Sequence, residues 1–213
     1  MADIFKEVDE ELRRDHADRL WKKYGKYVIA VALAAVLATA GFEAWKWWDT
    51  AQRTERSERY AAAVQLLERG DSEAAAAAFG EISGTDGGYG TLAAFNEANL
   101  LAAAGDAAAA IEVWDRLAAS KAADPAFRGA ATLLAVLHQL DDGDPAVLQG
   151  RLQPLTLAGS GFRPMALELT AVLALRQGER ARARELYAQI ADDRAAPVGL
   201  RARASQMLDA LEE

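Results

Sequence analysis

The pattern of hydrophobic and polar positions defines one segment sharply. Residues 28–42 read VIAVALAAVLATAGF, fifteen consecutive residues without a charged side chain. With Tyr27 the run would make about 24 Å of helix, slightly short of the ~30 Å hydrocarbon core of a bilayer. The flanking aromatic residues, a type that favours the lipid–water interface, are Tyr24, Tyr27, Trp45, Trp47 and Trp48. The pattern predicts a transmembrane helix over 27–48, with these five residues at the membrane interface.

Two other interpretations of this run stay open. A buried helix of a soluble domain is one, because the run is short and rich in alanine. A cleaved signal peptide is the other, since Ala38-Thr39-Ala40 resembles a cleavage site. The 26 residues before the run contain seven acidic residues, however, which is unlike the usual start of a signal peptide. An uncleaved signal anchor fits the pattern best.

The basic residues near the run predict its orientation. Positions 12–26 hold six Lys and Arg residues, whereas positions 43–57 hold three. Because cytoplasmic flanks are richer in positive charge, the N-terminus is expected in the cytoplasm. The rest of the chain then lies outside the cytoplasm. In a Gram-negative bacterium the protein would be a single-pass protein of the inner membrane with a periplasmic C-terminal domain.

Residues 1–26 form a separate arm that carries seven basic and seven acidic residues. Its apolar positions recur about every 3.6 residues: Ile4, Phe5, Val8, Leu12, His16, Leu20 and Tyr24. This spacing predicts a cytoplasmic amphipathic helix that lies on the membrane or against a partner. A partly ordered tail is the alternative.

After the apolar run, glycines recur at a regular interval. Gly70, Gly105, Gly143 and Gly178 are separated by 35, 38 and 35 residues, and each is followed by Asp or Glu. The surrounding stretches are rich in alanine and have no alternating strand pattern, which favours helices. Glycine permits the tight turn between two helices, and the acidic residue suits the start of the next helix.

Residue size around these glycines also repeats. The residue seven positions before the glycine is Ala63, Ala98, Val136 or Ala171, and five positions after it comes Ala75, Ala110, Leu148 or Ala183. Nine positions after it comes Phe79, Trp114, Leu152 or Tyr187, and twelve after it Ile82, Leu117, Leu155 or Ile190. Small residues allow two helices to approach closely, and the large residue fills the space beside the next pair. This predicts a helix–turn–helix repeat of about 34 residues.

These features resemble the tetratricopeptide repeats over roughly 55–191, with a degenerate third unit and a final capping helix, PVGLRARASQMLDALEE. The resemblance implies an all-α fold, in which a single N-terminal transmembrane helix precedes a solenoid of about four helical hairpins and a cap. The expected segments are 1–26, a cytoplasmic arm; 27–48, a signal anchor; and 49–213, a periplasmic repeat domain.

The arrangement of arm, anchor and alanine-rich repeats is similar to that of the ancillary SecYEG translocon subunit family (YfgM type). This wider resemblance implies a protein-interaction module that links exported proteins or chaperones to the translocon. The implied partners are translocon subunits, periplasmic chaperones or exported clients, together with membrane lipid. The alternative is a structural or assembly subunit of another inner-membrane complex.

Composition argues against several other functions. The net charge of −8 opposes binding to phosphate backbones, so no nucleic-acid partner is expected. The chain has no cysteine, and its two histidines, His16 and His138, would lie on opposite sides of the membrane. The glycine-rich SGTDGGYG lacks the lysine of a phosphate-binding loop. We therefore expect no catalytic residues, metal, cofactor or small-molecule substrate, and a protein that is not an enzyme.

The first helix of each hairpin is expected to line a concave, largely apolar groove. The candidate protein-binding residues are Tyr60, Leu92, Phe95, Asn99, Met165 and Glu168. Of the Lys and Asn residues with which some domains of this family bind a C-terminal carboxylate, only Asn99 is present. Packing of these residues inside the solenoid is the alternative. Arginines crowd the last repeat and cap, where a basic binding surface or a solvated helix face would explain them.

The predicted topology can be tested with alkaline phosphatase, which is active only outside the cytoplasm. We expect a fusion after Glu213 to be active, because the positive charge before the apolar run retains the N-terminus inside. Enzyme activity in intact cells is the measurement. An inactive fusion after Glu213 would contradict the topology and the periplasmic role together.

Overall fold

The computed structural model describes the backbone of residues 2–85 and 87–212, and their side chains except those of 2–21, 25, 28 and 32. In this described part every regular element is a helix. The chain divides into two compact units, Met1–Glu55 and Arg56–Glu213. Each unit is described by itself. The predicted all-α class is confirmed.

Helix α1 (Ala2–Glu68) forms the first unit and contributes its last residues to the second. Its portion Ile29–Glu68 contains a stretch that is long and apolar enough to cross a membrane by length and composition, and none of that stretch is buried. The predicted interface residues on it are all exposed: Tyr24, Tyr27, Trp45, Trp47 and Trp48. Of the predicted amphipathic stripe, the side chains up to Leu20 lie outside the described residues.

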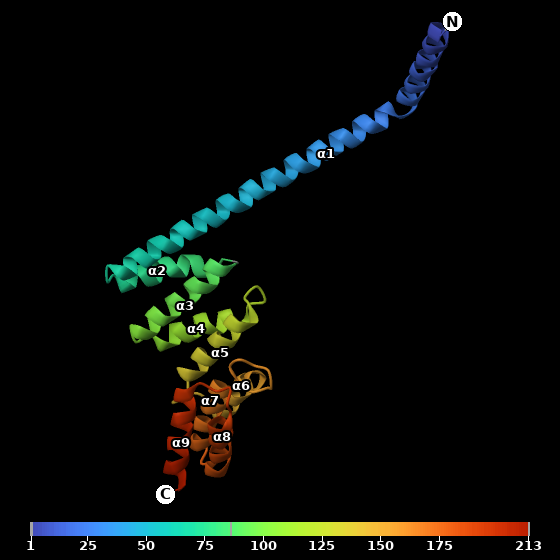
Figure 1. The fold of residues 1–213 in the computed structure, drawn as a ribbon. Helices are drawn as coiled ribbons and strands as arrows, with labels where there is room; N and C mark the ends of the chain where they lie inside the picture. Colours follow the sequence, from blue (N-terminus) through green and yellow to red (C-terminus); the bar gives the residue numbers. More distant parts are fainter. Residues whose placement is uncertain (1, 86, 213) are drawn as a thin grey trace. The chain divides into compact units, whose positions relative to one another are not determined.

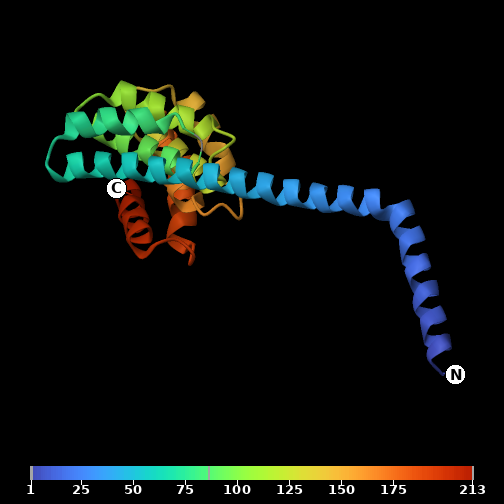
Figure 2. The same ribbon diagram turned by 90° about the horizontal axis from the view of Figure 1, so that it is seen from above.

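The second unit is a series of antiparallel helical hairpins (Figure 1). The end of α1 pairs with α2 (Ser72–Ser83), and α3 (Gly88–Ala103) pairs with α4 (Ala107–Ala119). The remaining helices are α5 (Pro125–Leu137), α6 (Pro145–Leu152), the short 3₁₀ helix η1 (Gln153–Leu155), α7 (Arg163–Arg176), α8 (Arg180–Asp192) and α9 (Val198–Glu212). Successive helices from α2 to α5 pack against one another, as both ribbon views show (Figure 2).

The Gly-Asp pairs end one helix and begin the next. At the first turn, the Gly70 N–H donates to the Leu67 carbonyl (2.9 Å) and the Asp71 N–H to the Leu66 carbonyl (3.1 Å), which is the Schellman pattern. The φ of Gly70 is 82°, a region that favours glycine. The Asp71 carboxylate then accepts a hydrogen bond from the Ala74 N–H and caps α2. Two adjacent residues therefore fix the whole turn.

The same turn recurs with one variation. Gly105 (φ 87°) and Gly178 (φ 77°) make the same pair of backbone hydrogen bonds, and Asp106 caps α4 as Asp71 caps α2. At the last turn the longer Glu179 makes no side-chain cap. Its carboxylate instead lies 3.7 Å from Arg182. The three turns predicted from these glycines are confirmed.

Small residues lie at the crossing of the first, second and last hairpins. Ala98 on α3 and Ala110 on α4 are both completely buried. The equivalent alanines of the first hairpin, Ala63 and Ala75, and of the last, Ala171 and Ala183, are also completely buried. A methyl side chain keeps the distance between two helix axes short. The predicted close approach is therefore present in these three hairpins.

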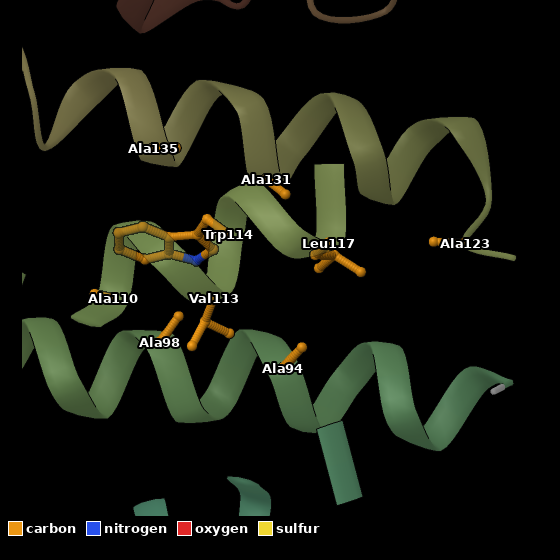
Figure 3. Packing of buried hydrophobic residues seen from close by; sticks show 9 residues of the cluster. All are labelled: Ala94, Ala98, Ala110, Val113, Trp114, Leu117, Ala123, Ala131 and Ala135. Carbon is orange, nitrogen blue, oxygen red and sulfur yellow. The ribbon is translucent and has the colours of Figure 1, made fainter. Parts of the chain in front are cut away.

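The large residue of each second helix fills the space next to the following hairpin. Trp114 on α4 is completely buried between α3 and α5, where it belongs to one cluster with Ala98, Ala131 and Ala135 (Figure 3). Phe79 and Tyr187 have the same role in their repeats. An aromatic ring supplies a large apolar area and so ties each hairpin to its neighbour.

The third repeat departs from the pattern for identifiable reasons. Gly143 does not have a positive φ. Glycine is nevertheless required at position 143, because a Cβ there would lie 2.8 Å from the Gln139 carbonyl oxygen and 2.9 Å from the Leu148 side chain. Helix α6 ends at Leu152, since Pro154 has no N–H to continue the α-helical pattern. Leu155, expected on the second helix of the hairpin, lies in η1 instead.

The turn geometry generates a paired prediction for the full chain in mild detergent. Gly105→Ala should lower the free energy of unfolding by about 1–2 kcal/mol, because alanine is strained at positive φ although the site has open space. Gly84→Ala is the control: Gly84 ends α2 with right-handed φ of −79° and also has open space. We expect that variant to be neutral or slightly stabilised. Urea unfolding followed by circular dichroism measures both, and equal losses would contradict the turn assignment.

Candidate protein-binding surface

An aromatic cluster lies where the first two hairpins meet. The Tyr60 ring lies 5.4 Å from the Phe79 ring and 5.5 Å from the Tyr89 ring, measured between centroids. Hydrogen bonds hold it in place: the Tyr89 hydroxyl donates to the Ser57 hydroxyl (3.0 Å), and the Asn96 amide donates to the Tyr60 hydroxyl (3.0 Å). Ring contacts and hydrogen bonds at the hydroxyl groups therefore both hold Tyr60 and Tyr89 in place.

The cluster continues into a partly exposed apolar surface. On α3, Tyr89 and Leu92 are three residues apart and keep 38% and 40% of their surface exposed. Phe95, one further step along α3, is half-buried, and its ring lies 5.9 Å from the ring of Phe127, which is 38% exposed. We call Tyr60, Tyr89, Leu92, Phe95 and Phe127 the aromatic face.

The contacts of the aromatic face repeat from one hairpin to the next. Tyr89 and Phe127 each lie sixteen residues before the turn glycine of their own repeat, and each packs on the residue ten positions before the preceding turn glycine. Phe162 occupies the equivalent position in the last repeat, at the N-terminal end of α7. Sequence reasoning missed Tyr89 and Phe127, although an aromatic residue at this fixed offset was a signal that could have found them.

The residues proposed for the groove fall into two groups. Tyr60, Leu92 and Phe95 belong to the aromatic face, and Asn99 is exposed on the same helix α3. Met165 and Glu168 lie on α7. Val64 and Leu67, on the same helix as Tyr60, are half-buried against the core of the first hairpin. A binding role for the six candidate residues stays a prediction.

Met165 lies at an apolar cavity of about 550 Å³. The cavity is bounded by the loop 158–161 and by Pro164 and Pro197. Its charged residues, Arg163 and Asp193, pair with each other at 3.5 Å. The cavity is therefore a neutral hollow beside the last repeat.

Glu168 is held by the cap. The Arg203 guanidinium on α9 donates two hydrogen bonds to its carboxylate, at 2.9 and 3.1 Å. This bidentate bond to Glu168 raises the pKa of Arg203. Burial and then the negative charge of Glu168 raise the pKa of Tyr187 above its usual value. Glu168 is thus engaged inside the chain.

Three arginines of the last repeat and cap pair with acidic residues. Arg203 binds Glu168, Arg184 binds Glu212, and Arg182 lies beside Glu179. Arg176 donates to the Gly143 carbonyl across the neighbouring turn. These four arginines are therefore engaged in contacts within the chain. Among the described residues no group of three or more His, Asp or Glu is placed to hold a metal ion.

Comparison with known proteins identifies one family. A family model described as a tetratricopeptide repeat-like domain matches residues 19–213. The match begins before residue 28, so it includes the apolar run as well as the hairpins. No curated protein and no solved structure matches the chain. The finer resemblance to translocon subunits stays a prediction.

The environment of Tyr187 predicts a change of stability with pH. Because its folded-state pKa is raised, the unfolded chain ionises first when the pH rises above about 10, and stability then falls until the folded-state pKa is reached. Tyr187→Phe should lose less unfolding free energy between pH 9 and pH 11 than the wild type. Urea unfolding at each pH measures the difference, with Tyr27→Phe as the control. Parallel curves for wild type and Tyr187→Phe would contradict the assignment.

Proposed function

Because the chain belongs to the tetratricopeptide repeat-like domain family, we propose that it is a membrane-anchored protein-interaction module. Domains of this family are typically interaction modules without catalytic activity. The observation that carries the proposal is the aromatic face, where Tyr89, Leu92 and Phe127 keep 38–40% of their surface exposed beside the half-buried Tyr60 and Phe95. Ordered apolar side chains at a surface are typical of protein-binding sites.

The anchor is the apolar stretch of α1. Its exposed apolar side chains, which include Leu33, Leu37 and Phe42, would face lipid. Lys23 and Lys26 lie 5.3 and 5.1 Å from the rings of Tyr24 and Tyr27, an arrangement that suits an interface with headgroups. Residues 27–48 would then cross the inner membrane, with 1–26 in the cytoplasm and 49–213 in the periplasm.

In this setting the module would serve as an ancillary translocon subunit. Segments that have just been exported, and the chaperones that receive them, expose apolar side chains that the aromatic face would contact. The resemblance to ancillary SecYEG subunits supports this partner class. The proposed partners of the protein are translocon subunits, periplasmic chaperones and exported clients.

Site-specific photo-cross-linking in the native cell tests this proposal. Benzoylphenylalanine at Leu92 or Phe127 is expected to capture translocon subunits, chaperones or exported proteins. The control positions are Glu73 and Glu112, which are exposed on the second helices of their hairpins. Capture of the subunits of another inner-membrane complex would replace the translocon assignment. Cross-links no stronger at Leu92 and Phe127 than at the controls would contradict an interaction role for the aromatic face.

A further inference from the structure

One side of helix α3 is exposed and carries no charge. The exposed residues of α3 are Gly88, Tyr89, Leu92, Asn99 and Ala103. The one charged residue in the sequence of α3, Glu97, is half-buried, and its carboxylate lies toward Gly80 of α2. In a chain with a net charge of −8, this helix therefore offers an uncharged surface.

The second helices of the same hairpins are different. Helix α2 exposes Glu73 and Glu81, and α4 exposes Glu112 and Arg116. In a symmetric pair of identical chains the same surface is contributed twice, so a surface with a surplus of one charge repels its own copy. The exposed side of α3 has no such surplus and meets this requirement for self-association.

The residues on this side of α3 also have the spacing of a helix–helix contact. Tyr89, Leu92, Asn96, Asn99 and Ala103 follow one another at intervals of 3, 4, 3 and 4 residues. Asn96 is half-buried, and the other four are exposed. This is the spacing with which one helix packs along another in coiled coils and helix bundles. We call these five residues the α3 seam.

The α3 seam is complementary to a reversed copy of itself. If two copies of α3 pack antiparallel, with the two-fold axis between positions 96 and 99, Leu92 of each copy faces Ala103 of the other. A large side chain then meets a small one on both sides of the axis. Asn96 of each copy faces Asn99 of the other in the same arrangement.

The free hydrogen-bonding groups of these two asparagines also match. The Asn96 amide nitrogen donates to the Tyr60 hydroxyl and the Leu92 carbonyl, at 3.0 and 2.9 Å, which leaves the Asn96 side-chain oxygen as an acceptor. The Asn99 side chain makes no hydrogen bond to another described residue. Its amide nitrogen is thus a free donor. The two-fold axis brings each donor to the acceptor of the other copy, so the pair forms two equivalent hydrogen bonds.

We propose that α3 of one chain packs antiparallel against α3 of a second chain along the α3 seam. Tyr89 and Leu92 also belong to the aromatic face, so the second copy covers the surface at which partners are proposed to bind. The inference rests on the anchoring in the proposed function, because copies held in one membrane meet at the high effective concentration that a short seam needs. A chain released from its pair exposes the aromatic face.

Charged substitutions at Asn99 test the pairing, with the full chain reconstituted in phosphatidylcholine vesicles. Asn99→Glu should weaken self-association about tenfold, because the axis brings the two carboxylates close together, and Asn99→Lys should weaken it by a similar factor. An equal mixture of the two variants should associate to within about threefold of the wild type, since opposite charges then face each other. This recovery also shows that both variants are folded.

Energy transfer between donor-labelled and acceptor-labelled copies measures the association. The chain has no cysteine, so one cysteine introduced at the exposed Ala210 of α9 carries either dye. Vesicles that also contain an excess of unlabelled wild-type chain give the background of random proximity. Leu157→Glu and Leu157→Lys are the control pair, because Leu157 is 62% exposed and lies outside α3. Both controls should associate as the wild type does, alone and mixed.

Cysteine pairs test the direction of the two helices. Oxidation of Leu92→Cys chains mixed with Ala103→Cys chains should link the two variants, because these positions face each other. Leu92→Cys chains alone should link more slowly, since antiparallel packing separates the two positions by about 16 Å along the helices. A mixture of Leu92→Cys and Glu112→Cys chains is the control for random collision. Faster linking of Leu92→Cys to itself than to Ala103→Cys overturns the antiparallel seam.

The outcomes also separate this inference from the proposed function. The inference is overturned if wild-type copies give no energy transfer above background, if Asn99→Glu associates as tightly as the wild type, or if the mixture stays dissociated. If photo-cross-linking at Leu92 and Phe127 then still captures the proposed partners, the interaction role stands without the pairing. If it captures a second copy of the chain alone, the pairing stands and the proposed partners are wrong.

Discussion

The repeat unit depends on how closely two helices of a hairpin approach each other. At the crossing of three hairpins both residues are completely buried alanines, such as Ala98 and Ala110. This contact sets the distance between the helix axes, and the Gly-Asp turn sets their connection. A larger side chain at either alanine would separate the helices and move the aromatic residue that ties one hairpin to the next. The turn, the helix crossing and the aromatic contact between hairpins therefore depend on one another.

The aromatic face is a consequence of the same constraint. Once the spacing of hairpins is fixed, an aromatic residue at the start of one hairpin lies over the first helix of the preceding one, as Tyr89 lies over Tyr60 and Phe127 over Phe95. Each ring buries one side against its neighbour and leaves the other exposed. The side chains that stabilise adjacent hairpins are thus the same ones that we propose for binding, and they lie on the helices of the repeat itself.

Much of the fold could be predicted because its determinants are local. The glycines, the alanines and the buried aromatic residues recur at fixed offsets, and each offset reports a contact within one hairpin or between adjacent ones. The third repeat was harder to predict. There Gly143 is required because Gln139 and Leu148 leave no room for a Cβ, and Pro154 shortens helix α6. The pairing of Arg203 with Glu168 joins residues 35 positions apart on different helices. Sequence spacing does not report such a pair, so the arginines fitted either a basic binding surface or a solvated helix face. Tyr89 and Phe127 were missed because they lie sixteen residues before the turn glycine, an offset that the predicted repeat pattern did not include.

The order of the ring contacts gives the series of hairpins a direction. Each exposed ring rests on the hairpin that comes before it in the chain, never on the one after it, for both pairs that form the aromatic face. Loss of hairpins from the C-terminal side would remove rings and leave the platforms beneath the earlier ones intact. Loss of the first hairpin would leave Tyr89 without its support. The support of the exposed rings therefore runs in one direction along the chain, opposite to that of the buried Trp114, which packs against the following helix α5.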